Sequence, residues 1–218
     1  MARSLFNRRA LLAIEFAILF FGLPCFFYFH ATRWNVHLTL WLASIYALVM
    51  LHWDDGFSWH TLWHGTGWAA RDRKIAALRF AITIPLIIGL TLYLAPDRLF
   101  SFPLHRPFFW LVVMILYPLL SVVPQELVFR SLFFRRYRDL FPNGAALIAS
   151  NAFCFGLMHA VFHNWVSPLL SLAGGLFFAL SYSHHRALKW AALEHAAYGC
   201  MVFTVGIGFY FLVGGGRL

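Results

Sequence analysis

Seven apolar runs of membrane-spanning length occupy most of this chain. They cover residues 11–29, 36–53, 76–95, 108–133, 144–163, 166–184 and 188–212. A helix needs about 20 apolar residues to cross the hydrocarbon core of a bilayer, where every backbone group must be hydrogen-bonded within the protein. Of the 218 residues, 61% are hydrophobic and 11% are charged, which leaves no polar stretch long enough for a separate soluble domain. We therefore expect an all-α, polytopic transmembrane bundle of about seven spans, in which residues 1–218 form a single membrane-embedded domain.

The segment 54–74 is too polar to span a membrane. It contains Trp59, Trp63 and Trp68 together with several Arg and Lys residues. Tryptophan beside basic residues is typical of the boundary between lipid and water. We expect a helix that lies along this interface.

The basic residues flank the apolar runs. If the N-terminus is cytoplasmic and the spans alternate, twelve of the 17 Lys and Arg residues are cytoplasmic: Arg3, Arg8, Arg9, Arg71, Arg73, Lys74, Arg79, Arg135, Arg136, Arg138, Arg186 and Lys189. Four are external (Arg33, Arg98, Arg106 and Arg217), and Arg130 lies within a span. This bias supports the span count and a cytoplasmic N-terminus. We expect a multi-pass protein of a bacterial inner membrane. The net charge of +9 therefore reflects contact with the lipid bilayer, and we expect no nucleic acid partner.

Several ionisable side chains lie inside the predicted spans: Glu15, Glu126, Arg130, His159, Glu194 and His195. Each costs about 2.5–3.5 kcal/mol at the centre of a bilayer, so such groups usually face the interior of a bundle and serve a function. Glu126 and Arg130 share a helix face at spacing i, i+4, which by itself indicates an internal salt bridge. Histidines on two further spans are harder to explain by packing.

A carboxylate and an imidazole can together hold a water molecule and remove its proton, and a second imidazole can donate to the oxyanion of an attacked carbonyl. A dehydrated, low-dielectric site strengthens these interactions. The set Glu126, His159 and His195 therefore favours hydrolysis.

Three short motifs resemble those of the CAAX protease and bacteriocin-processing (CPBP, or ABI) family of intramembrane glutamic-type proteases. The family motifs E-E-x-x-x-R, F-x-x-x-H and H-x-x-x-N correspond here to QELVFR (125–130), FGLMH (155–159) and HAAYG (195–199). The resemblance covers about 108–205. It implies a helical membrane fold and an endopeptidase that hydrolyses a peptide bond of a membrane-associated peptide or protein, with Glu126, His159, His195, Gln125 and Arg130 as site residues and no cofactor.

Two positions depart from the family pattern. Gln125 replaces the glutamate that the family uses to activate water, and an amide cannot act as a general base. Either Glu126 assumes this role or the chain is an inactive variant. Gly199 replaces the asparagine, which removes an oxyanion donor; Glu194 and Asn164 are polar groups that could compensate.

Other enzymatic interpretations remain open. His159 and His163 are four residues apart, as in zinc proteases, and Glu126 or His195 could supply a third ligand for a zinc-dependent enzyme. A cysteine nucleophile is a weaker alternative, because Cys154 and Cys200 each lie five residues from a motif histidine, about 140° around the helix.

A non-enzymatic membrane protein, with a transport, immunity or scaffold role, is an alternative of another class, since membrane Glu and His residues also build proton relays. The distances of Glu126 and His195 from Arg135 and Lys189 predict a site that opens toward the cytoplasmic half of the bilayer. His159 lies deeper and conflicts with this placement.

Overall fold

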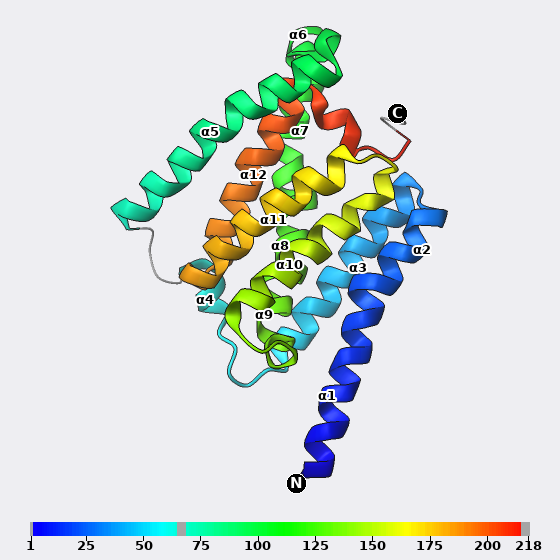
Figure 1. The fold of residues 1–218 in the computed structure, drawn as a ribbon, viewed down its shortest axis with the longest axis vertical. Coiled ribbons are helices and arrows are strands. Elements are labelled where there is room, and N and C mark those ends of the chain that lie inside the picture. The colour runs from blue at the N-terminus through cyan, green and yellow to red at the C-terminus, as the bar shows by residue number, and fades with distance from the viewer. Residues whose placement is uncertain (1, 65–68, 215–218) are drawn as a thin grey trace.

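The structure is a computed structural model that describes residues 2–64 and 69–214. Its regular elements within these ranges are helices (Figure 1). The α-helices are α1 (Ala2–Ala17), α2 (Leu23–His30), α3 (Arg33–His52), α4 (Trp59–His64), α5 (Ala70–Leu94), α6 (Ser101–His105), α7 (Pro107–Tyr117), α8 (Val123–Glu126), α9 (Phe133–Arg136), α10 (Gly144–Met158), α11 (Val166–His185) and α12 (Leu188–Val205). Wider π-turns are η1 (Ile18–Gly22), η3 (Pro118–Val122) and η4 (Leu127–Leu132), and short 3-10 turns are η2 (Pro96–Arg98), η5 (Arg138–Leu140), η6 (His159–Phe162) and η7 (Ile207–Phe211).

Six helices in the described residues are long and apolar enough to cross a membrane. They are Arg8–His30, Trp34–His52, Ala70–Leu94, Pro107–Arg136, Gly144–Phe162 and Val166–His185. These helices correspond to the first six predicted runs, so the prediction of a helical membrane bundle is confirmed. The seventh run, 188–212, forms α12 and then breaks at Gly206.

The break at Gly206 follows from backbone geometry. Its φ of +123° lies in a region that L side chains rarely adopt, and a Cβ there would overlap the carbonyl oxygen of Arg98. The neighbouring Val205 accepts a hydrogen bond from the amide of Phe100 at 3.0 Å. Glycine therefore lets the end of α12 dock closely against the segment before α6.

The predicted interfacial helix is shorter than expected. Within 54–74, the described helix α4 covers only Trp59–His64, and Trp68 lies outside the described residues. The basic end of the segment belongs to α5, which begins at Ala70. The carboxylate of Asp72 accepts the amide of Ala69 at 3.0 Å, and this cap extends the helix toward its N-terminus. The exposed rings of Trp59 and Trp63 keep the character of an interfacial segment.

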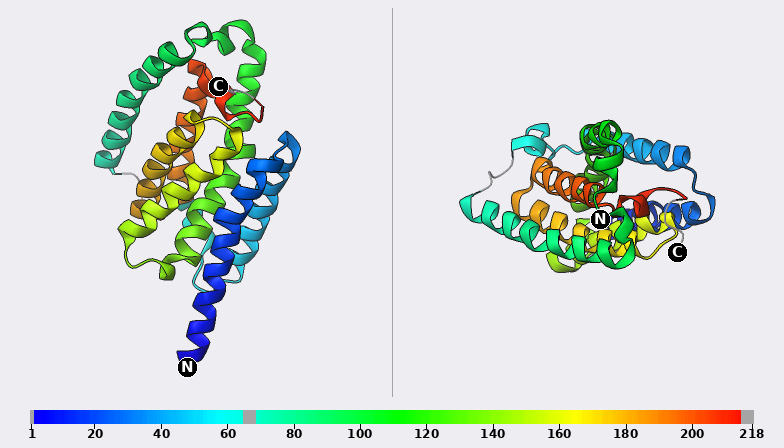
Figure 2. Two further views of the ribbon diagram at one scale, coloured as in Figure 1. Left: turned by 45° about the vertical axis from the view of Figure 1, so that its right-hand side comes forward. Right: turned by 90° about the horizontal axis from the view of Figure 1, so that it is seen from above.

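The long helices run up and down between two ends of the bundle. One end carries the N-terminus and the connections at 53–58, 137–143 and 186–187 (Figure 1). The other, which we call the far end, carries the connections at 31–32, 95–106 and 163–165 and residues 206–214. Helix α5 lies at the edge of the bundle, where it packs on α12 (Figure 2).

The span Pro107–Arg136 is irregular where it carries the first motif. Pro118 and Pro124 lack the backbone N–H that an α-helix needs, and π-turns η3 and η4 lie on either side of the single turn α8. The carbonyl of Pro124 accepts a hydrogen bond from Ser44 of α3 at 3.0 Å. This irregular winding lies directly at Glu126 and Arg130, both of which are completely buried.

Glu15 of α1 contacts the end of the span Pro107–Arg136. Its carboxylate accepts two hydrogen bonds from the guanidinium of Arg136 and one from the hydroxyl of Tyr137. Phe20, one turn further along the first span, packs edge-on against Phe129 and Phe133, with ring centroids 5.4 and 4.9 Å apart. These contacts fix the first span against the helix that carries the motif.

Candidate active site

The buried ion pair of Glu126 and Arg130 lies behind the wall of the candidate site. Nε of Arg130 lies 3.1 Å from Oε2 of Glu126, and neither side chain has any exposed surface. The guanidinium also donates to Oδ1 of Asn151 on α10, and the amide of Asn151 donates to the carbonyl of Phe129. The ring of Phe155 lies 5.1 Å from the guanidinium carbon. Buried charges are stable only when they are paired in this way.

The carboxylate of Glu126 also binds His195. Its Nδ1 lies 2.8 Å from Oε1 of Glu126, and its ring is stacked on Phe178 with centroids 4.7 Å apart. An ionised carboxylate only accepts hydrogen bonds, so Nδ1 carries the proton and Nε2 of the neutral ring has a free lone pair. The carboxylate therefore fixes both the orientation and the tautomer of His195.

His159 reaches the site from the far end of α10. It begins turn η6, and its Nδ1 donates to the carbonyl of Phe155 at 2.7 Å. A carbonyl accepts only, so in the neutral ring Nε2 of His159 is again the unprotonated nitrogen. The backbone carbonyl of His159 accepts a hydrogen bond from Ser167 of α11, which anchors the turn.

A cavity of about 550 Å³ brings the motif residues together. His159, His195 and Gln125 line it, but Glu126 does not. Gln125 and Glu126 are neighbours on one helical turn and point about 100° apart, so they do not point in the same direction. The amide of Gln125 donates to Ser121, another lining residue, at 2.8 Å.

The cavity extends along much of the bundle. Its walls include the early part of α3, the late parts of α10 and α12, and residues 211–213, which lie toward the far end (Figure 1). They also include Tyr46 of α3 and Leu132, four residues before the end of the span Pro107–Arg136, which lie toward the opposite end. The opening of the site toward the cytoplasmic half of the bilayer therefore stays a prediction.

Two side chains of the candidate site escaped sequence reasoning. Asn151 was detectable as an uncharged polar residue in the middle of a span, where a buried amide must find partners. Tyr117 lies 3.2 Å from Nε2 of His195 through its hydroxyl and lines the cavity. Its sequence context, ILYPLL, gives no signal of this contact, which depends on how α7 packs against α12.

Other polar residues considered in the sequence lie outside the cavity wall. Glu194 is buried and forms an ion pair with Arg79 of α5 at 3.5 Å. Asn164 donates to the carbonyl of Tyr210 and accepts from the amide of Ser167, so its amide organises the far-end turn. His163 packs against Tyr28, with ring centroids 4.6 Å apart. Glu194 and Asn164 therefore do not replace the missing asparagine.

The cysteines likewise do not line the cavity. Cys154 is buried and Cys200 is partly buried, with its sulfur turned to the carbonyl of Met114. Neither thiol therefore stands where it could attack a peptide in the cavity.

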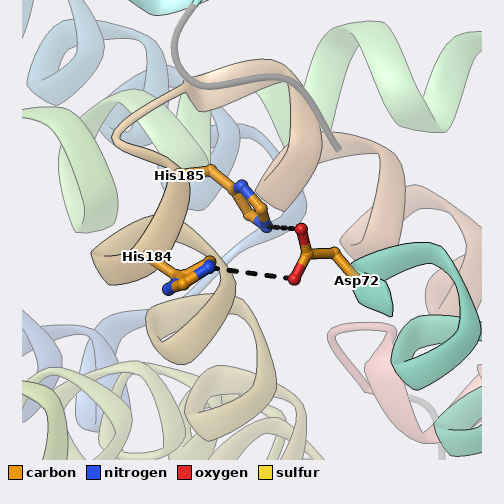
Figure 3. A group of neighbouring side chains, drawn as sticks. All are labelled: Asp72, His184 and His185. Carbon is orange, nitrogen blue, oxygen red and sulfur yellow. Dashed lines mark ion pairs between the residues drawn. The ribbon is translucent and has the colours of Figure 1, made fainter. Parts of the chain in front are cut away.

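A separate cluster of potential metal ligands lies where the N-terminus of α5 meets the C-terminus of α11 (Figure 3). Nε2 of His184 is 3.8 Å and Nε2 of His185 is 4.0 Å from the two carboxylate oxygens of Asp72. Among the described residues, this group alone places three such ligand atoms within 4.8 Å of one another. Asp72 also caps α5. The cluster therefore joins the N-terminal end of α5 to the C-terminal end of α11.

Residues 107–201 match the model of a known family, described as Rce1-like, type II CAAX prenyl endopeptidase. The matched segment begins at α7 and ends in α12, and it contains all three motifs and Tyr117. The matched residues overlap the segment, about 108–205, that carries the resemblance described above. No curated protein and no solved structure gives a match.

Proposed function

Because residues 107–201 of this integral membrane protein match the model of the Rce1-like family of CAAX endopeptidases, we propose that the chain hydrolyses a peptide bond of a membrane-associated peptide or protein. The observation that carries the proposal is the position of His195. Its Nδ1 is paired with a buried carboxylate, and its side chain lines the cavity. A carboxylate–histidine pair of this kind is suited to remove a proton from water.

The proposed reaction uses His195 as the general base. Water attacks the carbonyl carbon of the peptide and gives its proton to Nε2, while the carbonyl π electrons move to the oxygen. The carboxylate of Glu126 stabilises the imidazolium that forms, as in other carboxylate–histidine pairs. The C–N bond then breaks, and Nε2 returns the proton to the leaving amine.

The remaining polar residues have supporting roles in this proposal. Arg130 balances the charge of Glu126 and holds its second oxygen. His159 offers a second unprotonated nitrogen that can orient the water molecule. No step requires a metal ion or another cofactor.

The surroundings of the cavity favour an apolar substrate. Side chains of Leu23, Phe27, Leu116, Val202 and Phe203 form parts of its wall. The distribution of basic residues predicts that the N-terminus of this membrane protein is cytoplasmic.

A second candidate function is supported by Gln125. Its amide lines the cavity where the family pattern has a carboxylate, and the nearest carboxylate is turned away. A chain with this arrangement could bind the same class of peptide without cleaving it.

The protein reconstituted in lipid vesicles separates these functions. We would incubate it with a library of apolar and lipidated peptides and detect fragments by mass spectrometry. Fragments from the wild type and none from His195→Ala support hydrolysis. Peptide retention without fragments supports the binding function, whereas a transporter would move peptide or protons and release no fragment.

A further inference from the structure

Each of the two histidines of the site has one unprotonated ring nitrogen, which can accept but not donate a hydrogen bond. Nδ1 of His195 donates to Glu126, and Nδ1 of His159 donates to the carbonyl of Phe155. The remaining nitrogen of each neutral ring therefore carries no proton. Hydrolysis of a peptide also needs donors, because negative charge develops on the carbonyl oxygen as water attacks. Those donors must come from other side chains.

Tyr117 supplies a donor at the reactive nitrogen. Its hydroxyl lies 3.2 Å from Nε2 of His195, and its ring meets the imidazole edge-on, with centroids 6.2 Å apart. Phe203 supports the ring from a second direction at 5.3 Å. Since Nε2 of the neutral ring can only accept, the phenol must donate the hydrogen of this bond.

Gly199 makes this position of Tyr117 possible. It lies one turn after His195 on α12, and a Cβ at this residue would overlap the hydroxyl and two ring carbons of Tyr117. Tyr117 in its present position and an asparagine at 199 are therefore mutually exclusive. The departure of Gly199 from the H-x-x-x-N pattern and the position of the phenol form one structural unit.

We propose that Tyr117 donates the hydrogen bond that stabilises the oxyanion, in place of an asparagine at position 199. In the resting site its O–H is directed to Nε2 of His195. When peptide and water bind, the O–H turns from Nε2 to the carbonyl oxygen of the peptide, which frees the lone pair of Nε2 to take the proton of the attacking water. The phenol then donates to the negatively charged oxygen that forms. The phenol keeps its proton throughout, so protonation of His195 and stabilisation of the oxyanion are coupled. This inference rests on the proposed hydrolysis.

The first test is Tyr117→Phe, which removes only the hydroxyl. We expect kcat to fall by about 10²–10³-fold, the usual effect of one oxyanion donor, with KM changed by less than about twofold. Tyr93→Phe is the control for the loss of a phenol hydroxyl, because Tyr93 is exposed and does not line the cavity. An unchanged kcat in Tyr117→Phe, or an equal loss in Tyr93→Phe, contradicts the proposal.

The second test moves the donor back to position 199. Gly199→Asn alone should lower kcat, because its Cβ displaces the phenol. In the double variant Tyr117→Ala/Gly199→Asn the space is free, and we expect at least about a tenfold recovery over Tyr117→Ala alone, which is part of the value of one oxyanion donor. A double variant no faster than Tyr117→Ala contradicts the exchange of donors.

A third measurement does not depend on activity. Diethyl pyrocarbonate acylates unprotonated imidazole nitrogens, and mass spectrometry of the peptide containing His195 reports the rate. Tyr117→Phe should raise this rate roughly fivefold, as the loss of one neutral hydrogen bond predicts. If acylation of His195 is faster in Tyr117→Phe but the wild type cleaves no peptide, the hydrogen bond exists. The proposed hydrolysis and the oxyanion role are then both refuted. An active wild type with unchanged Tyr117→Phe kinetics would refute the oxyanion role alone.

Discussion

Glu126 holds His195 through the nitrogen that faces away from the cavity. The 2.8 Å contact between Oε1 and Nδ1 is completely buried on the carboxylate side, and Glu126 does not line the cavity. A water molecule in the cavity therefore meets the imidazole and not the carboxylate. The expectation that Glu126 itself removes the proton is replaced by a proposal in which it orients and charges His195.

Replacing the buried carboxylate should affect both activity and stability. In Glu126→Gln, we expect kcat to fall by about 10⁴-fold, as for the same change in a comparable carboxylate–histidine pair. The variant also leaves the charge of Arg130 buried without its partner, which should cost about 3–5 kcal/mol of unfolding free energy. Cleavage assays and denaturation in detergent measure the two effects.

A double variant separates these two contributions. Glu126→Gln/Arg130→Met removes both buried charges, so we expect it to recover most of the stability lost in Glu126→Gln. It should stay inactive, because no carboxylate orients His195. Recovery of activity in the double variant would contradict the role of Glu126.

His159 should be required for cleavage, and His163 should not. His159→Ala removes a nitrogen from the cavity wall, and we expect kcat to fall by about 10²–10⁴-fold. His163→Ala is the matched control, since this ring packs on Tyr28 outside the cavity wall. Comparable losses in both variants would favour the zinc alternative, in which the two histidines act together.

Removal of metal ions tests the same alternative directly. The atoms that the described residues bring close enough to share an ion belong to Asp72, His184 and His185, away from the cavity wall. We expect the cleavage rate to be unchanged after treatment with a chelator. Loss of activity on chelation, restored by Zn²⁺, would show a catalytic metal ion.

The spans were predictable from the sequence because the length and polarity of a run decide whether it can cross a bilayer. The pairing of Glu126 with Arg130 and the meeting of these residues with His195 were also accessible, because charged groups in a span must find partners. The contact between Tyr117 and His195 was not accessible. It depends on the rotation of two helices that pack together, and apolar runs do not encode that rotation in a simple pattern.

The surface pair of Asp54 and Arg135 predicts a small pH dependence of stability. Nη2 of Arg135 lies 2.9 Å from Oδ1 of Asp54, and this hydrogen bond holds the pKa of Asp54 below its ordinary value of 3.8. A lowered carboxyl pKa stabilises the folded state above pH 3.8, and this contribution disappears as the pH falls through the folded-state pKa. Because the pair is about one-third exposed, we expect Asp54→Asn to cost at most about 1 kcal/mol at pH 7. The difference from the wild type should vanish in strongly acidic buffer, as measured by denaturation.

The identity of residue 125 tests most directly whether His195 is the base. Cleavage of one peptide in lipid vesicles would be compared among the wild type, Gln125→Glu and His195→Ala. Our account predicts that the wild type cleaves, that Gln125→Glu changes the rate by less than about tenfold, and that His195→Ala is inactive. A silent wild type that Gln125→Glu converts into an active protease would contradict the account, because position 125 would then hold the missing catalytic carboxylate.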